Sequence, residues 1–247
     1  IDKNIINKII EASKITSTDE ILEVGPGTGN LTKLIVSQKP KKIYLIEKDE
    51  KLADSLKKQY LDKINLIKKD ILKIPYDFYF EKKFLVIGNL PYNISTKILS
   101  DWCLNKKLNV SKMILMFQKE VAERILAGVN SKEYSRITIL SKWKFDIKKI
   151  TDVKANSFFP KPKVQSMVLE FIPKKKIHEI KDPKNLEKIT KVFFNQRRKM
   201  IKKPINILFK NYQFNYKKFN IKPSDRPQNL DVEKYLQIVS EYESLGS

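Results

Sequence analysis

The chain has 247 residues, of which 41% are hydrophobic and 32% charged, a balance typical of a folded globular protein. Lysine and arginine outnumber aspartate and glutamate by 50 to 28, and the net charge of +22 predicts a polyanionic partner, either a nucleic acid or an anionic membrane surface. One cysteine and one histidine exclude a disulfide framework and disfavour a metal site or a histidine-based catalytic triad. No apolar run is long enough to cross a bilayer, so we expect no membrane segment.

The sequence starts at Ile1 without a charged, apolar leader, and we expect a cytoplasmic protein. Import into an organelle, directed by a segment upstream of Ile1, stays an open alternative. Cys103 lies beside Trp102 in an apolar helical pattern, which predicts a buried thiol rather than a nucleophile.

Residues 2–13 show helical spacing of isoleucines, and residues 20–24 are typical of a short strand. The strand runs into Gly25, Gly27 and Gly29, and a helical pattern resumes at Asn30. Strand, glycine loop and helix together let backbone N–H groups approach a ligand closely. A dinucleotide fingerprint would need glycine at position 30, so the spacing speaks against that cofactor. A turn that binds nothing is the alternative.

Two further strands end in acidic residues. Residues 42–47 end at Glu47 and are followed by a helix from about residue 49 to 61, and residues 64–68 lead to Asp70. Acids at the carboxyl ends of parallel strands face the crevice where open α/β sheets bind ligands. We expect Glu47 to accept ribose hydroxyl groups and Asp70 to accept from an adenine amino group. Solvated strand-end charges are the alternative.

The fourth strand, 84–88, leads into Asn89, Leu90, Pro91 and Tyr92, which we call the ledge. Asparagine can hold a flat nitrogen heterocycle by its edge, proline fixes the turn, and tyrosine offers a stacking face. We therefore expect a nucleobase to be methylated on the ledge. A helix follows from about residue 94, capped by Asn93 or Ser95.

The remaining elements follow from apolar periodicity, with 134–142 equally compatible with a helix or an extended segment. We expect strands at 112–117, 143–153 and 164–171, an irregular loop at 156–163, and helices at 118–126, 186–195, 201–209 and 232–242. A break at residues 173–176 divides the chain into a catalytic domain, 1–172, and a helical RNA-binding domain, 173–247.

The tail is strongly basic, since residues 172–247 carry 18 basic against 8 acidic groups. Its candidate RNA-binding residues are Arg197, Arg198, Lys199, Lys202 and Lys203. A solvated helix end with favourable dipole placement is an equally weighted alternative for this cluster.

These motifs, in this order, resemble the rRNA adenine N6-dimethyltransferases. The segments that carry the resemblance are EVGPGTGNLT, LIEKD, KKD, NLPYNIST and FFPKPKVQS, and the tail runs FNQRRK and RPQNL are most similar to the small-subunit branch, the KsgA type. The family's Gln-Asn-Phe-Leu run, which should end just before Ile1, is absent, and a glutamine, Gln228, replaces the usual acid in the second tail run.

The resemblance implies an α/β fold: a Rossmann-like, seven-stranded class I methyltransferase core with its last strand antiparallel, and a small helical domain. It implies S-adenosylmethionine as cofactor, held by Gly25, Gly27, Gly29, Glu47, Asp70, Ile71 and Asn89. It implies that Asn89, Leu90, Pro91 and Tyr92 hold the target adenine and that Phe158 closes over it. The expected partner is small-subunit rRNA or the pre-small ribosomal subunit, and the expected state a monomer.

Three other functions compete with this one. The large-subunit enzyme of macrolide resistance shares the fold, but usually has isoleucine where this chain has Leu90. A non-catalytic ribosome-assembly or transcription factor would not need the acids and the ledge. A small-molecule methyltransferase would not need the basic tail.

Overall fold

The computed structural model describes residues 2–75 and 83–245. The chain divides into two compact units. The first, here the N-terminal unit, takes its residues from Ile1–Leu99, Lys107–Ala122 and Phe145–Pro173, and the second, the C-terminal unit, from Ser100–Lys106, Glu123–Lys144 and Lys174–Ser247. The change near residue 173 lies where the composition breaks, but 100–106 and 123–144 join the C-terminal unit from within the earlier part of the chain.

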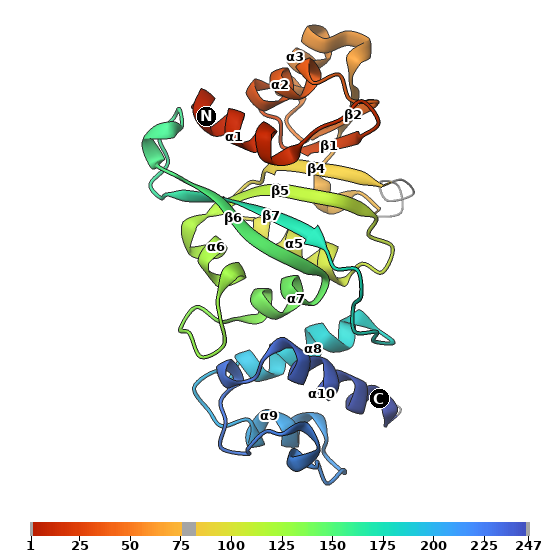
Figure 1. The fold of residues 1–247 in the computed structure, drawn as a ribbon, viewed down its shortest axis with the longest axis vertical. Coiled ribbons are helices and arrows are strands. Elements are labelled where there is room, and N and C mark those ends of the chain that lie inside the picture. The colour runs from red at the N-terminus through yellow and green to blue at the C-terminus, as the bar shows by residue number, and fades with distance from the viewer. Residues whose placement is uncertain (1, 76–82, 246–247) are drawn as a thin grey trace. The chain divides into compact units, whose positions relative to one another are not determined.

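The N-terminal unit is built on one seven-stranded sheet of order β3-β2-β1-β4-β5-β7-β6 (Figure 1). The strands are β1 (Glu20–Val24), β2 (Lys42–Glu47), β3 (Asn65–Lys68), β4 (Phe84–Asn89), β5 (Val110–Gln118), β6 (Phe145–Val153) and β7 (Ser166–Pro173). Strands β1 to β5 are parallel, and β7 is antiparallel to both β5 and β6. This confirms the α/β methyltransferase-like architecture expected from the sequence.

The central strands are buried on both faces, which explains their continuous apolar runs. Every residue of β1 is buried, and Ile21, Ile87 and Ile114 on three neighbouring strands have no exposed surface. They belong to one hydrophobic cluster with residues of α1 (Lys3–Ser13), α2 (Asn30–Ser37) and α3 (Glu50–Tyr60). Helix α5 (Ser95–Leu104) follows the ledge, and α6 (Lys119–Leu126) follows β5.

The helices of the C-terminal unit are α7 (Arg136–Lys144), α8 (Pro183–Phe194), α9 (Lys202–Leu208) and α10 (Val232–Ser244). Helix α8 begins three residues before the expected start because Asp182 caps it and proline occupies its first turn. The segment 134–142, which the sequence left open between a helix and an extended segment, is mostly helical and belongs to α7. Six of its nine residues are buried, so it lacks the polar face that would have indicated a helix.

Short 3-10 segments connect several of these elements: η1 (Leu61–Lys63), η2 (Ile71–Lys73), η3 (Ala155–Ser157), η4 (Tyr216–Phe219) and η5 (Pro227–Asn229). Within 2–75 and 83–245, no helix has both the length and the apolar character required to cross a membrane. The same residues contain no cluster of three or more histidine, cysteine, aspartate or glutamate side chains placed to hold a metal ion.

Candidate functional site

The carboxyl ends of three neighbouring strands meet at one edge of the sheet. Val24, the last residue of β1, pairs with Ile46 of β2 and with Gly88 of β4. This register brings the next residues, Gly25, Glu47 and Asn89, to the same edge. Because β1 lies between β2 and β4, this is the point where the strand order reverses and where open α/β sheets bind ligands.

The glycine loop has a backbone that only glycine adopts without strain. Gly25, Gly27 and Gly29 have φ angles of 69°, 59° and 80°. The Gly25 N–H donates to the Ile46 carbonyl at 3.0 Å, and a Cβ on Gly25 would lie 3.5 Å from the Asn89 carbonyl oxygen. The loop therefore passes close to the start of the ledge.

Two glycines of the loop differ in how much space surrounds them, which gives a matched pair of substitutions. A Cβ on Gly29 would lie 2.7 Å from Leu56 Cδ2, whereas a Cβ on Gly27 would have no heavy atom within 4 Å. We expect Gly27→Ala to cost about 1 kcal/mol for the positive φ alone. Gly29→Ala should cost a further ~1–3 kcal/mol for overpacking against α3. Urea unfolding curves check this, and equal midpoints for the two variants would contradict it.

The Glu47 carboxylate ties the glycine loop to the end of β2. Its Oε2 accepts the Gly27 N–H at 3.1 Å and its Oε1 accepts the Asp49 N–H at 3.0 Å. The side chain is 7% exposed and lines the cavity described below. An ionised carboxylate that accepts N–H groups here can also accept hydroxyl groups of a ribose.

A second acid, Glu23, lies deeper and has a different environment. It is 1% exposed, and its Oε2 accepts the Thr32 hydroxyl of α2 at 2.7 Å. Burial, reinforced by the charge of Glu47 and opposed by the Thr32 hydrogen bond, raises the pKa of Glu23 to about 8. Glu23 therefore links β1 to α2 as a largely protonated group at neutral pH.

A cavity of about 150 Å³ opens at this edge of the sheet. It is lined by Val24, Gly25, Ile46, Glu47, Lys48, Lys69, Asp70, Ile71, Asn89, Pro91 and Ile94. Pockets that hold a whole drug-sized ligand usually measure about 300–1,000 Å³, so this one has room for part of a nucleoside cofactor. Six predicted residues meet here: Gly25, Glu47, Asp70, Ile71, Asn89 and Pro91.

Other residues named from the sequence lie outside this lining. Leu90 is fully buried, and Tyr92 is half-buried. Phe158 is half-buried and packs against the hydrophobic cluster that includes α1. Sequence reasoning missed Lys48, Lys69 and Ile94, which line the cavity. Lys48 and Lys69 directly adjoin Glu47 and Asp70, and their adjacency to the strand-end acids was the available signal.

The ledge is held rigidly by its own hydrogen bonds. The Pro91 carbonyl accepts the N–H groups of Ile94 at 3.1 Å and Ser95 at 2.9 Å, and the Ser95 hydroxyl donates to the Tyr92 carbonyl at 3.2 Å. The Tyr92 hydroxyl bonds the Ser166 hydroxyl at 2.5 Å, which sets the position of its ring.

Asn89 is the unusual member of the ledge. Its side-chain Oδ1 is buried and has no hydrogen-bond partner in the described structure. A buried carbonyl left without a donor costs about 1–3 kcal/mol, so such groups call for an explanation. An N–H group of a ligand that enters beside Gly25 and Pro91 would supply the missing donor.

Around α9, the cationic side chains differ in what they contact. Arg197 is half-buried and donates to the carbonyls of Ser131, at 3.2 Å, and Lys132. The cations that follow it in sequence, Arg198, Lys199, Lys202 and Lys203, are exposed. A hollow of about 360 Å³ is lined by residues 194–199 and Lys203. Arg197 therefore holds the 131–132 segment, and the other four can meet an external anion.

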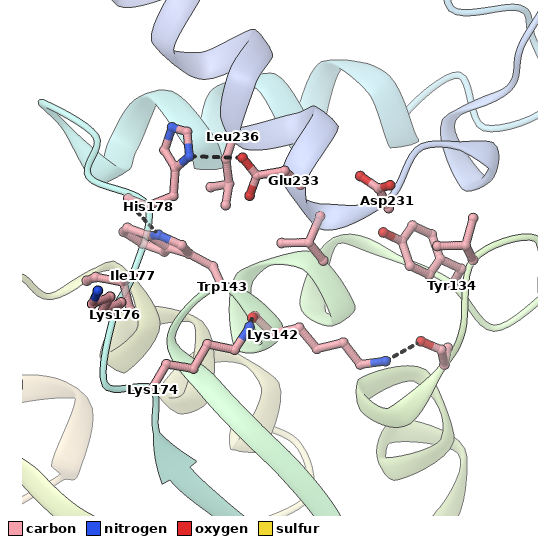
Figure 2. Close-up of a pocket in the computed structure, with 13 residues that line it drawn as sticks. Tyr134, Lys142, Trp143, Lys174, Lys176, Ile177, His178, Asp231, Glu233 and Leu236 are labelled. Carbon is pink, nitrogen blue, oxygen red and sulfur yellow. Dashed lines mark hydrogen bonds and ion pairs between the residues drawn. The ribbon is translucent and has the colours of Figure 1, made fainter. Parts of the chain in front are cut away.

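A larger cavity, of about 410 Å³, lies within the C-terminal unit and contains no predicted site residue (Figure 2). Two of its lysines are engaged with backbone carbonyls: the Lys142 ammonium donates to those of Leu126 and Ala127, and the Lys174 ammonium to that of Lys142. Trp143 Nε1 donates to the His178 carbonyl at 2.9 Å. These bonds connect α7 to the 174–178 segment, so the lining is explained by packing.

The sequence model of one family, described as ribosomal RNA adenine dimethylase, matches residues 1–244. The chain belongs to the ribosomal RNA adenine dimethylase family. This confirms the family that the glycine loop, the strand-end acids and the ledge indicated. Within that family, the chain is 50% identical to the "Ribosomal RNA small subunit methyltransferase A" of Pelagibacter ubique, over 99% of this chain and 94% of the relative.

Two solved structures have a similar fold. A dimethyladenosine transferase from Plasmodium falciparum is 29% identical, with a TM-score of 0.85 over 99% of this chain and 97% of the other. The 23S rRNA methyltransferase ErmE is 22% identical, with a TM-score of 0.71 over 100% of this chain and 99% of the other, which shows the shared fold alone.

Proposed function

We propose that this protein dimethylates the N6 amino groups of two adjacent adenosines in a 3′-terminal hairpin of small-subunit rRNA, with S-adenosylmethionine as methyl donor, during small-subunit assembly. The observation that carries the chemistry is the partnerless, buried Oδ1 of Asn89 beside the cavity of Gly25, Glu47 and Asp70. The branch is supported by the 50% identity to a small-subunit enzyme. The protein would act as a monomer, without a metal.

The cavity would hold part of the nucleoside end of the cofactor. Glu47 would accept the ribose hydroxyls, Asp70 the adenine amino group, and Ile71 would flank the adenine ring. A Cβ on Gly25 would lie 3.5 Å from the backbone carbonyl oxygen of Asn89. Because glycine has no Cβ, this space stays open for the cofactor to pass the glycine loop. When bound, S-adenosylmethionine supplies a methyl group on a sulfonium sulfur, whose leaving group is neutral and needs no acid.

The ledge would then prepare the acceptor. An adenine amino group is a poor nucleophile because its lone pair is delocalised into the ring. Asn89 Oδ1 and the Leu90 backbone carbonyl would accept hydrogen bonds from its N–H groups, which favours a pyramidal nitrogen with its lone pair directed at the cofactor side. After each methylation the nitrogen would lose one proton, which passes to water. Tyr92, fixed through Ser166, and Phe158 would hold the base once it leaves its stack. Catalysis is then positioning and electrostatics, without a strong general base.

RNA binding would use the exposed cations around α9, which predicts a difference between neighbouring arginines. Arg198→Ala with Lys199→Ala should weaken binding to the pre-small subunit and reduce the slope of log K against log salt by about 1–2. These side chains are exposed, so stability should not change. Filter binding at several salt concentrations checks this, and an unchanged slope would leave Arg198 and Lys199 as a solvated helix end.

Arg197→Ala is the matched comparison. Its guanidinium donates to the backbone carbonyls of residues 131 and 132, so its loss should lower the unfolding midpoint and leave the salt slope of RNA binding unchanged. A wild-type midpoint with a reduced slope would contradict this difference.

The proposed function is tested by labelled S-adenosylmethionine supplied with under-methylated small-subunit and large-subunit particles. Label recovered as dimethyladenosine from the small-subunit particle alone is the expected result. Label in the large-subunit particle would assign the protein to the macrolide-resistance branch. Absence of label in both, with particle binding retained, would indicate a non-catalytic assembly factor.

A further inference from the structure

The loop that joins β6 to β7, residues 154–165, is anchored near both of its ends (Figure 1). The Ser157 carbonyl accepts the Asp2 N–H at 2.6 Å, beside the start of α1. At the other end, the Gln165 carbonyl accepts the Lys119 N–H at 2.9 Å, and the Ser166 hydroxyl bonds Tyr92 of the ledge at 2.5 Å. The loop is thus tied directly to the residue expected to stack on the target base.

Two adjacent phenylalanines of this loop have opposite environments. Phe158 packs against the hydrophobic cluster, whereas Phe159 is 98% exposed. The next most exposed large hydrophobic side chain among the described residues is Leu61, at 63%. Leaving a phenylalanine fully in water forgoes about 1.5–3 kcal/mol of burial, so a ring held in this way fits a site that is covered when a partner binds.

The surroundings of Phe159 indicate which partner. Lys154, Lys161 and Lys163 are exposed in the same loop, and the sequence has no aspartate or glutamate from residue 153 to 169. An aromatic ring among cations is the arrangement that binds single-stranded nucleic acid, because the ring stacks on a base while the ammonium groups contact phosphates. An acidic protein surface would meet the lysines but would need an aromatic or guanidinium group at this one point, whereas every base of an RNA strand has a π face.

We propose that Phe159 is a stacking platform for an unpaired base near the target adenine in the same RNA strand, with Lys161 and Lys163 on the flanking phosphates. Ser166 lies seven positions after Phe159, a stretch that spans at most about 25 Å when fully extended, so the platform stays within reach of the ledge. Phe159 is then a positioning residue: it orients the strand, and Asn89 acts on the reacting amino group. The inference rests on the proposed function.

The test uses the full chain and a small-subunit 3′-terminal rRNA hairpin in which 2-aminopurine replaces, one at a time, each base flanking the target adenines. Wild type should quench the fluorescence at one flanking position. Phe159→Ala should abolish that quenching and raise the KM for RNA about tenfold, with kcat at saturating RNA and cofactor affinity unchanged. Phe159→Trp should restore both.

Controls separate stacking from other causes. Val164→Ala truncates another exposed hydrophobic side chain of this loop and should leave quenching and KM unchanged. Phe159→Leu keeps apolar bulk without a π face and should behave like Phe159→Ala; a leucine that restores quenching and KM would overturn the stacking role. Because Phe159 is exposed, all its variants should unfold at the wild-type midpoint.

The two proposals fail differently. A wild-type protein that methylates neither ribosomal particle overturns the proposed function and this inference with it. A wild-type protein that methylates the small-subunit particle, beside a Phe159→Ala variant with unchanged KM and unchanged quenching at every position, overturns this inference alone.

Discussion

Asn89→Ala should lower the rate of methyl transfer about 100- to 1,000-fold, the usual effect of removing one preorganised group that acts on the reacting atoms. The loss should be in kcat, because the proposed function assigns RNA affinity to the cations around α9. Single-turnover assays with saturating cofactor and under-methylated small-subunit particles measure it. Turnover at the wild-type rate would refute the role proposed for the side-chain carbonyl of Asn89.

The same substitution should not destabilise the protein. Asn89 Oδ1 is buried without a partner, so its removal relieves a desolvation cost of about 1–3 kcal/mol that offsets the small cavity left by truncation. We expect an unfolding midpoint equal to or above that of wild type, which is the signature of a group kept for function. Asn4→Ala, at an exposed asparagine of α1, is the control and should change neither rate nor midpoint.

Glu47→Ala should weaken cofactor binding about 10- to 100-fold. Hydrogen bonds to a charged group contribute about 1.5–3 kcal/mol, and each 1.4 kcal/mol is a factor of ten in affinity. The variant also leaves the N–H groups of Gly27 and Asp49 without their acceptor, so the glycine loop loses its link to β2. Isothermal titration with S-adenosylmethionine measures the affinity.

Two comparisons sharpen the Glu47 result. Glu47→Gln keeps an acceptor in place without the charge and should fall between wild type and Glu47→Ala. Glu50→Ala removes an exposed acid in the first turn of α3 and should leave affinity unchanged. If Glu47→Ala binds the cofactor as tightly as wild type does, the ribose is not held by this carboxylate.

The local chemistry of the cleft could be predicted from sequence because it depends on residues near strand ends. Gly25, Glu47 and Asn89 lie at the ends of short apolar runs and Asp70 lies two residues past a strand, and parallel strands bring such positions to one edge whatever surrounds them. The seven strands could be predicted for a similar reason, because apolar runs bounded by glycine, proline or polar residues are visible in the local sequence.

Other features depended on long-range packing. The sequence left 134–142 open between helix and extended segment because burial on nearly all sides of α7 removes the polar face that marks a helix. The C-terminal unit takes up 100–106 and 123–144, which no break in composition announces. A domain boundary predicted from composition divides the chain at one point along the sequence. It cannot show which helices from different parts of the sequence pack together.

By itself, then, the sequence determined the family, the sheet and the edge at which the predicted cofactor residues gather, because these follow from short motifs and their spacing. Only the tertiary structure decided which of two adjacent phenylalanines packs on the core and which of two adjacent arginines is held by backbone carbonyls. Identical residues side by side carry the same local signal. Their different roles come from the neighbours that folding places against each.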